Sequence, residues 1–146
     1  MPDHRPQSGQ TLIMFAITMT FMFLSLIALV GDADVLMVRY NEVNSEALLG
    51  AQAGATAIDE ADLYNGTYHL NRDNAAQRCE STAIPGGQTP THRVKCTPDP
   101  NPVPTTVTAD VSEDVDLPVP LFMARATVRA SRSARAVFGG QQILAP

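Results

Sequence analysis

The stretch LIMFAITMTFMFLSLIALV, from Leu12 to Val30, decides the fold of this chain because it is 19 residues long and carries no charge. Only two threonines and one serine interrupt its apolar side chains. A helix from Thr11 to Gly31 would be about 30 Å long, which matches the hydrocarbon thickness of a bilayer. We therefore expect a helix that can span a membrane.

A cleaved secretory signal is the main alternative for this block. Such a signal needs a basic start, a shorter apolar core and a small-residue cleavage site, whereas Leu29-Val30-Gly31-Asp32 is a poor site for cleavage. Helix-compatible sequence also continues past the block, because proline is absent from Gln7 to Ile84. The sequence therefore predicts a single helix from Thr11 to about Leu63.

The second half of this helix has a different character. Charged residues begin at Asp32, so the helix should leave the lipid near Gly31. Its apolar residues recur at spacings of three and four, which indicates one apolar stripe: Val35, Leu36, Val38, Val43, Ala47, Leu48, Ala51, Ala55, Ile58 and Ala61. Gly50 and Gly54 on the same half would let another backbone approach closely. That neighbour is either the chain's own sheet or another copy of the chain, and both can hold on opposite faces.

The remainder of the chain favours strands. Residues alternate between apolar and polar over Thr105 to Val111 and over Arg125 to Phe138, and His92 to Thr97 is a third candidate strand. Asn71 to Glu80 is predicted as a short helix. The prolines from Pro98 to Pro104 predict an extended, polyproline-like connector. The predicted fold class is α+β, with a long N-terminal helix followed by a small antiparallel sheet.

These elements divide the chain into four segments. We expect residues 1–9 to form a cytoplasmic segment and residues 10–31 to form a transmembrane helix. Residues 32–63 continue this helix as an amphipathic half. Residues 64–146 form an exported, β-rich globular domain.

The cysteines Cys79 and Cys96 are the two in the chain and predict one disulfide. The bridge would close a loop of about 17 residues and stabilise the domain by roughly 3 kcal/mol. A metal site is the weaker alternative, because His69 and His92 have no recognisable ligand spacing to the cysteines. We predict no metal and no cofactor.

The charge balance and the motifs argue against two classes of function. The net charge is −5 and Lys95 is the one lysine, whereas duplex binding requires many cations to neutralise phosphates. No Ser/His/Asp arrangement, phosphate-binding glycine loop or metalloprotease helix is found in the sequence. We therefore expect neither a nucleic-acid partner nor an enzyme.

Two charged clusters of opposite sign follow one another near the end of the chain. The acidic one contains Asp110, Glu113, Asp114 and Asp116, and the basic one contains Arg125, Arg129, Arg132 and Arg135. They could meet between subunits and set register, or they could be solvated faces with weak ion pairs. Asn65 starts a formal glycosylation acceptor, Asn65-Gly66-Thr67, but Asn-Gly more often simply makes a turn.

Three stretches resemble the TadE/TadG-like proteins of tight-adherence pili, within the type IV pilin-like class. The first is Ser8-Gly9-Gln10-Thr11 with the apolar run after it. The second comprises Asp32, Leu36, Val43-Asn44 and the stretch from Glu46 to Ala51. The third is Val119-Pro120-Leu121-Phe122, followed by the alternation from Ala126 to Ser131. Together they cover most of the chain outside residues 65–110.

The resemblance implies a structural subunit of an extracellular pilus-like filament for adhesion or surface attachment. A prepilin peptidase would cut between Gly9 and Gln10, and the chain would lie in the inner membrane before pilus-assembly machinery adds it to a helical homo-oligomer on the cell surface, with the C-terminal domain outside the cytoplasm. In this interpretation residues 1–9 are a leader and residues 10–31 are a filament-core helix. Contacts in the filament core or between packed helices would be made by Leu12, Phe15, Phe21, Phe23, Ile27, Gly50 and Gly54.

Met14 departs from the family pattern, because the fifth residue after the processing glycine is often Glu. It favours a first alternative, a minor membrane-anchored assembly or tip protein of the same system. A single-span anchored binding module for a surface ligand is the second alternative.

Overall fold

The computed structural model describes residues 8–59, 62, 64, 69–102, 104–119, 123–137 and 140–144. Within them lie two helices, α1 (Ser8–Ala55) and α3 (Arg72–Ala83). Four strands follow the helices in the chain: β1 (His92–Pro98), β2 (Thr106–Asp116), β3 (Arg125–Val137) and β4 (Gly140–Leu144). The strands form one antiparallel sheet in the order β1-β2-β3-β4. The predicted α+β class is confirmed.

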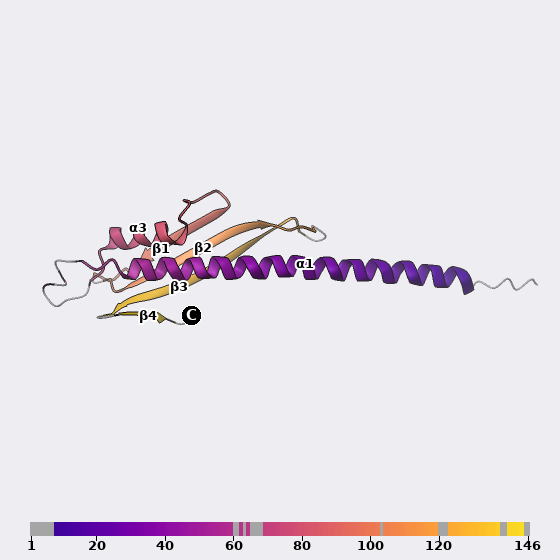
Figure 1. Cartoon of the computed structure of the whole chain (residues 1–146), viewed down its shortest axis with the longest axis horizontal. Helices are drawn as coiled ribbons and strands as arrows, with labels where there is room; N and C mark the ends of the chain where they lie inside the picture. The colour runs from indigo at the N-terminus through magenta and orange to yellow at the C-terminus, as the bar shows by residue number, and fades with distance from the viewer. Residues whose placement is uncertain are drawn as a thin grey trace, which may run out of the picture.

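Helix α1 dominates the shape of the molecule. Its 48 residues correspond to a rod of about 72 Å. Figure 1 shows that α3 and the sheet lie along the C-terminal half of this rod, while the N-terminal half extends away from them. One continuous helix therefore connects a packed domain to a bare apolar segment.

The helix ends earlier than the sequence predicts, at Ala55 rather than near Leu63. Just beyond it, Ile58 forms an antiparallel bridge with Leu70, and the Asp59 N–H donates to the His69 carbonyl (2.9 Å). This pairing brings the chain back toward α3. The predicted end is wrong because a tertiary pairing outweighs a composition that is compatible with helix.

The core is built from small side chains at regular spacings. On α1 the fully buried positions recur every four residues, at Val43, Ala47, Ala51 and Ala55. They face alternate residues of the two central strands, including Val107, Val111 and Ala134, and the register pairs Val107 with Ala134 and Val111 with Ala130. One face of the sheet is therefore covered by helix, and the opposite face carries polar side chains.

Helix α3 lies on the same face of the sheet, beside α1. The Asn71 side chain caps it by accepting from the Asn74 N–H (3.1 Å). Its buried residues, Ala75, Cys79 and Ala83, again recur every four positions. The helix predicted at 71–80 is therefore confirmed and extends three residues further.

The strands agree with the predicted ones except in three places. Strand β2 continues through the acidic run to Asp116, and β4 was not predicted. The polyproline connector is instead a hairpin loop, because Pro98 belongs to β1 and the Asp99 N–H donates to the Thr106 carbonyl (2.9 Å). The Asp99 carboxylate accepts from the Asn101 N–H (3.2 Å) and bends the loop.

Candidate membrane and assembly surface

The N-terminal half of α1 has almost no contacts within the chain. Every side chain from Gly9 to Gly31 is exposed, except that of Ala28, which is half-buried. The predicted processing residues Gly9 and Gln10 lie in this half, as do the predicted filament-core residues Leu12, Phe15, Phe21, Phe23 and Ile27. Leu12 is 71% and Ile27 is 68% exposed. The helix is long and apolar enough to cross a membrane.

The three hydroxyl groups of the apolar block from Leu12 to Val30 are satisfied within the helix. Thr18, Thr20 and Ser25 each donate to the carbonyl four residues earlier, with distances of 2.9 Å in all three cases. A hydroxyl hydrogen without a partner would be costly in hydrocarbon. These bonds make the polar interruptions compatible with an apolar environment.

The exposed apolar surface continues onto the outer side of the packed half. Met37, Val38, Tyr40 and Leu49 are all large and exposed. Val38 was expected on the buried stripe, and that expectation is wrong, because the buried positions are those in line with Val43 and Ala47. The packed half of α1 therefore keeps several large apolar side chains exposed.

The close approach at the two helix glycines is made within the chain. A Cβ atom at Gly50 would lie 2.8 Å from the Ala83 Cβ, and one at Gly54 would lie 2.9 Å from a Val107 methyl group and 3.0 Å from the Ala75 carbonyl oxygen. The element that approaches each glycine closely therefore belongs to the chain's own domain, namely α3 at Gly50 and both α3 and β2 at Gly54. Gly50 and Gly54 are packed within the domain core, and a contact of these residues in a filament stays a prediction.

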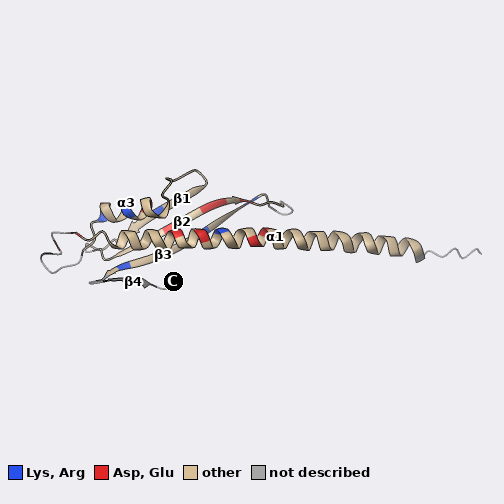
Figure 2. Cartoon of the chain, in the orientation of Figure 1, with Lys and Arg blue, Asp and Glu red and all other residues tan. Residues whose placement is uncertain are grey.

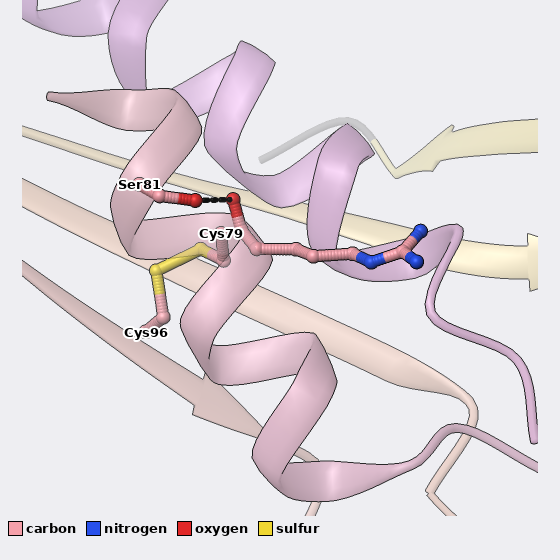
Figure 3. The surroundings of a disulfide bond; sticks show 4 residues. Cys79, Ser81 and Cys96 are labelled. Carbon is pink, nitrogen blue, oxygen red and sulfur yellow. Dashed lines mark hydrogen bonds between the residues drawn. A yellow bond between two sulfur atoms is a disulfide. The ribbon is translucent and has the colours of Figure 1, made fainter. Parts of the chain in front are cut away.

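The predicted disulfide is confirmed. Cys79 of α3 and Cys96 of β1 are bonded across 17 residues of sequence, and Figure 3 shows the bridge running from the helix to the neighbouring strand. In the same view the Ser81 hydroxyl donates to the Arg78 carbonyl (3.2 Å). The bridge fixes α3 to the sheet, and α3 in turn contacts α1 at the two glycines.

The acidic and basic clusters lie on neighbouring strands of the same sheet. Asp116 is the register partner of Arg125, and the Arg125 Nε donates to its carboxylate (2.8 Å). Asp114 accepts from the Thr127 hydroxyl (2.7 Å). Figure 2 shows acidic residues on both β2 and α1. Asp110, Arg129 and Arg135 are exposed to solvent as well.

The other two members of these clusters point toward α1. The Arg132 Nε donates to the Asn44 side-chain oxygen (2.8 Å), and Arg39 lies 3.7 Å from the Glu113 carboxylate. Both bonds connect the helix to the sheet within one chain. Part of each cluster is therefore already used in the fold rather than being available between subunits.

Sequence reasoning missed the polar contacts that align α1 with the sheet. His92 Nε2 of β1 lies 2.8 Å from the Glu46 carboxylate of α1. A second missed contact lies outside this interface, where His69 Nδ1 is 3.0 Å from the Asp62 carboxylate. Glu46 is one residue before Ala47 of the buried stripe, which places it at the margin of the helix–sheet contact. The position of Glu46 beside the buried stripe could have indicated a polar contact with the sheet. The sequence alone could not identify His92 as its partner.

The polar face of the sheet contains an open depression of about 660 Å³, lined by residues that include Arg93, Lys95, Asp110, Ser112, Arg129 and Ser131. Within the part of the chain that the structure describes, no three His, Cys, Asp or Glu side chains are close enough to hold a metal ion. Asn65, with its formal glycosylation acceptor, and Ala61 of the predicted stripe lie outside the described residues.

One ion pair changes the ionisation of its members. The Arg125 side chain lowers the pKa of the Asp116 carboxyl, first by hydrogen bonding and then by charge attraction. The same contact raises the pKa of Arg125. This pair closes the end of the hairpin formed by β2 and β3.

Comparison of the chain with models of known families, with curated proteins and with solved structures gives no match. The physical character of the surfaces described above is therefore the guide to function.

Proposed function

We propose that this protein is a structural subunit of an extracellular filament of the type IV pilus-like class, held in the membrane by α1 before assembly. The observation that carries the proposal is the bare N-terminal half of α1. The block from Leu12 to Val30 is apolar and, apart from half-buried Ala28, exposed, whereas residues 32–55 of the same helix lie along the domain. An apolar surface of this length in water would aggregate, so it needs lipid or protein around it.

The geometry suits an exchange between these two environments. Lipid tails can surround the N-terminal half while the chain is in the membrane, and the same half of neighbouring copies can replace them in a fibre. Contacts between different faces of successive copies do not close into a ring and so give an open helical polymer. The exposed residues Met37, Val38, Tyr40 and Leu49 would extend these contacts along the packed half.

Processing by a prepilin peptidase fits the position of Gly9. This residue lies in the first turn of α1, and no heavy atom beyond its immediate neighbours lies within 4 Å of a Cβ built there. The peptide bond to Gln10 is therefore not shielded by the domain. Intact-mass analysis of the mature chain tests this step, because a start at Gln10 supports processing and a start at Met1 contradicts it.

The filament proposal is tested with surface fibres sheared from cells that make the protein. The chain should be the dominant component of the fibres. A chain that is found in the membrane fraction and is absent from sheared fibres would contradict the role of a main subunit.

A minor, membrane-anchored subunit of the same kind of fibre is the second candidate, and Met14 favours it. Met14 is exposed on the apolar half and cannot form an ion pair with the amine that cleavage at Gly9 would create. An unpaired ammonium in an apolar core is expensive, which disfavours incorporation of many such copies. Fibres that contain the chain at a low ratio to another subunit would support this candidate. Met14→Glu would then be expected to raise that ratio.

A further inference from the structure

The hairpin that joins β2 to β3 ends beside the boundary between the two halves of α1. In Figure 1 the hairpin runs along α1 toward its bare half. The Val119 N–H donates to the Asp32 carboxylate (3.2 Å), and the Leu117 N–H donates to the Ala124 carbonyl (3.0 Å) across the hairpin. We call the described residues Leu117, Pro118, Val119 and Met123 the hairpin tip. Asp32, which is 87 positions before Val119 in the sequence, therefore fixes the tip to one point on α1.

This point coincides with the end of the apolar block. Asp32 comes two residues after Val30, which is a rise of about 3 Å along the helix. If Val30 lies at the edge of the hydrocarbon, Asp32 lies within the headgroup layer, which is several ångströms thick. A tip bonded to Asp32 is held at the same depth.

The tip has the character of a surface that inserts into this layer. Met123 is 56% and Val119 is 38% exposed, and the sequence has no charge between Asp116 and Arg125. Those two residues form the ion pair at the neck of the hairpin. The apolar tip would then lie toward the acyl chains, and the charged pair at the neck would lie toward the headgroups and water.

We propose that the hairpin tip is a second membrane contact, which inserts into the lipid interface next to α1 and fixes the orientation of the domain on the bilayer. The partner is the bilayer surface itself. This inference rests on the membrane-held state in the proposed function. Two points of contact would restrict rotation of the domain about the axis of α1, which a single helix cannot do.

Tryptophan fluorescence tests the inference directly, because the chain contains no Trp. Three single variants of the full chain, Met123→Trp, Phe21→Trp and Thr97→Trp, would be reconstituted in phosphatidylcholine vesicles with brominated acyl chains. Thr97 is the matched exposed control, since its partner Thr108 is eight residues from Asp116, or about 26 Å along β2. We expect a blue-shifted, quenched signal for Met123→Trp and Phe21→Trp, and no quenching for Thr97→Trp.

A second variant separates the tip from the intrinsic preference of Trp for interfaces. Adding Val119→Asp to Met123→Trp places a charge at the tip and should abolish the quenching, while far-UV circular dichroism remains unchanged. Quenching of Phe21→Trp with none of Met123→Trp would overturn the tip contact alone. Absence of quenching for Phe21→Trp would overturn the membrane-held state as well. A Met123→Trp emission shift that grows with the protein-to-lipid ratio, without quenching, would show that a second copy covers the tip and would overturn the lipid assignment.

Discussion

The two halves of α1 have the same backbone conformation and opposite surroundings. In the C-terminal half, small residues at four-residue spacing are fully buried against α3 and the sheet. In the N-terminal half, large apolar residues point outward from Leu12 to Val30. Small residues allow another element to approach closely, whereas large ones project on all sides. Side-chain size therefore decides which half packs within the chain and which half is left for lipid or for other copies.

A charge in the bare half should have the largest effect. Leu24→Arg is expected to make membrane insertion less favourable by about 2.5–3.5 kcal/mol, because a charged side chain would enter the hydrocarbon. The measurement is the fraction of chain recovered with vesicles after flotation, and we expect it to fall sharply. Met37→Arg is the matched control, since Met37 is also apolar and exposed but lies beyond Asp32. Equal flotation of both variants would contradict the distinction between the halves.

Removing the disulfide should affect the packed half alone. Cys79→Ala with Cys96→Ala is expected to lower the free energy of unfolding of the domain by about 3 kcal/mol, as closure of a 17-residue loop implies. Alanine leaves no polar group at these two buried positions. Chemical denaturation in detergent micelles measures the loss, and flotation with vesicles should be unchanged. A loss of flotation with a stable domain would show that the two halves are not independent.

The two kinds of glycine in α1 give a smaller and more local comparison. Gly54→Ala should destabilise the domain by about 1–3 kcal/mol, because the new methyl group would overlap with the Val107 side chain and the Ala75 carbonyl. Gly31→Ala is the control, since nothing lies within 4 Å of a Cβ built there. Thermal unfolding of the domain should shift for Gly54→Ala and stay unchanged for Gly31→Ala. Equal stability of the two variants would mean that α1 and α3 are less tightly packed than described.

The contrast between the halves also separates what the sequence can predict from what it cannot. The bare helix and β3 could be predicted because each leaves a signal within one segment of the sequence. For the helix this signal is the uncharged run from Leu12 to Val30, and for β3 it is the alternation in Arg125–Val137. The end of α1 at Ala55 depends on the bridge between Ile58 and Leu70, which joins residues that are 12 positions apart in the sequence. Local propensity contains no information about such a contact.

The candidate surface was predictable to the same extent. The exposed residues of the bare half follow from hydropathy alone. The destination of Gly50 and Gly54 does not, since a small-residue helix face accepts either α3 or another copy, and the choice depends on how Cys79 and Ala83 are presented. The hydrogen bond between Asp32 and Val119 could be predicted only if the length of the β2–β3 hairpin were known. The sequence predicts a strand that ends at Val111, whereas β2 extends to Asp116.

The smallest effect is expected at the neck of the hairpin, close to where the two halves meet. Arg125 holds the pKa of the Asp116 carboxyl below its ordinary value, which is about 3.9 in an unfolded chain. The pair therefore stabilises the folded state fully at pH values above the unfolded pKa. This contribution is lost as the pH falls through the lower, folded pKa. Both side chains are largely exposed, so the change in stability should be slight.

Titration of the Asp116 carboxyl by NMR measures this pair directly. Arg125→Gln should raise the pKa of Asp116 toward the ordinary value, whereas Arg129→Gln, an exposed neighbour on the same strand whose register partner is Ser112, should leave it nearly unchanged. The same titration in micelles and in vesicles also tests the position of the neck, because a headgroup layer against the hairpin would alter solvation of the pair. An unchanged pKa in Arg125→Gln would show that the neck is open, and the tip would then depend on the Asp32 contact alone for its position beside α1.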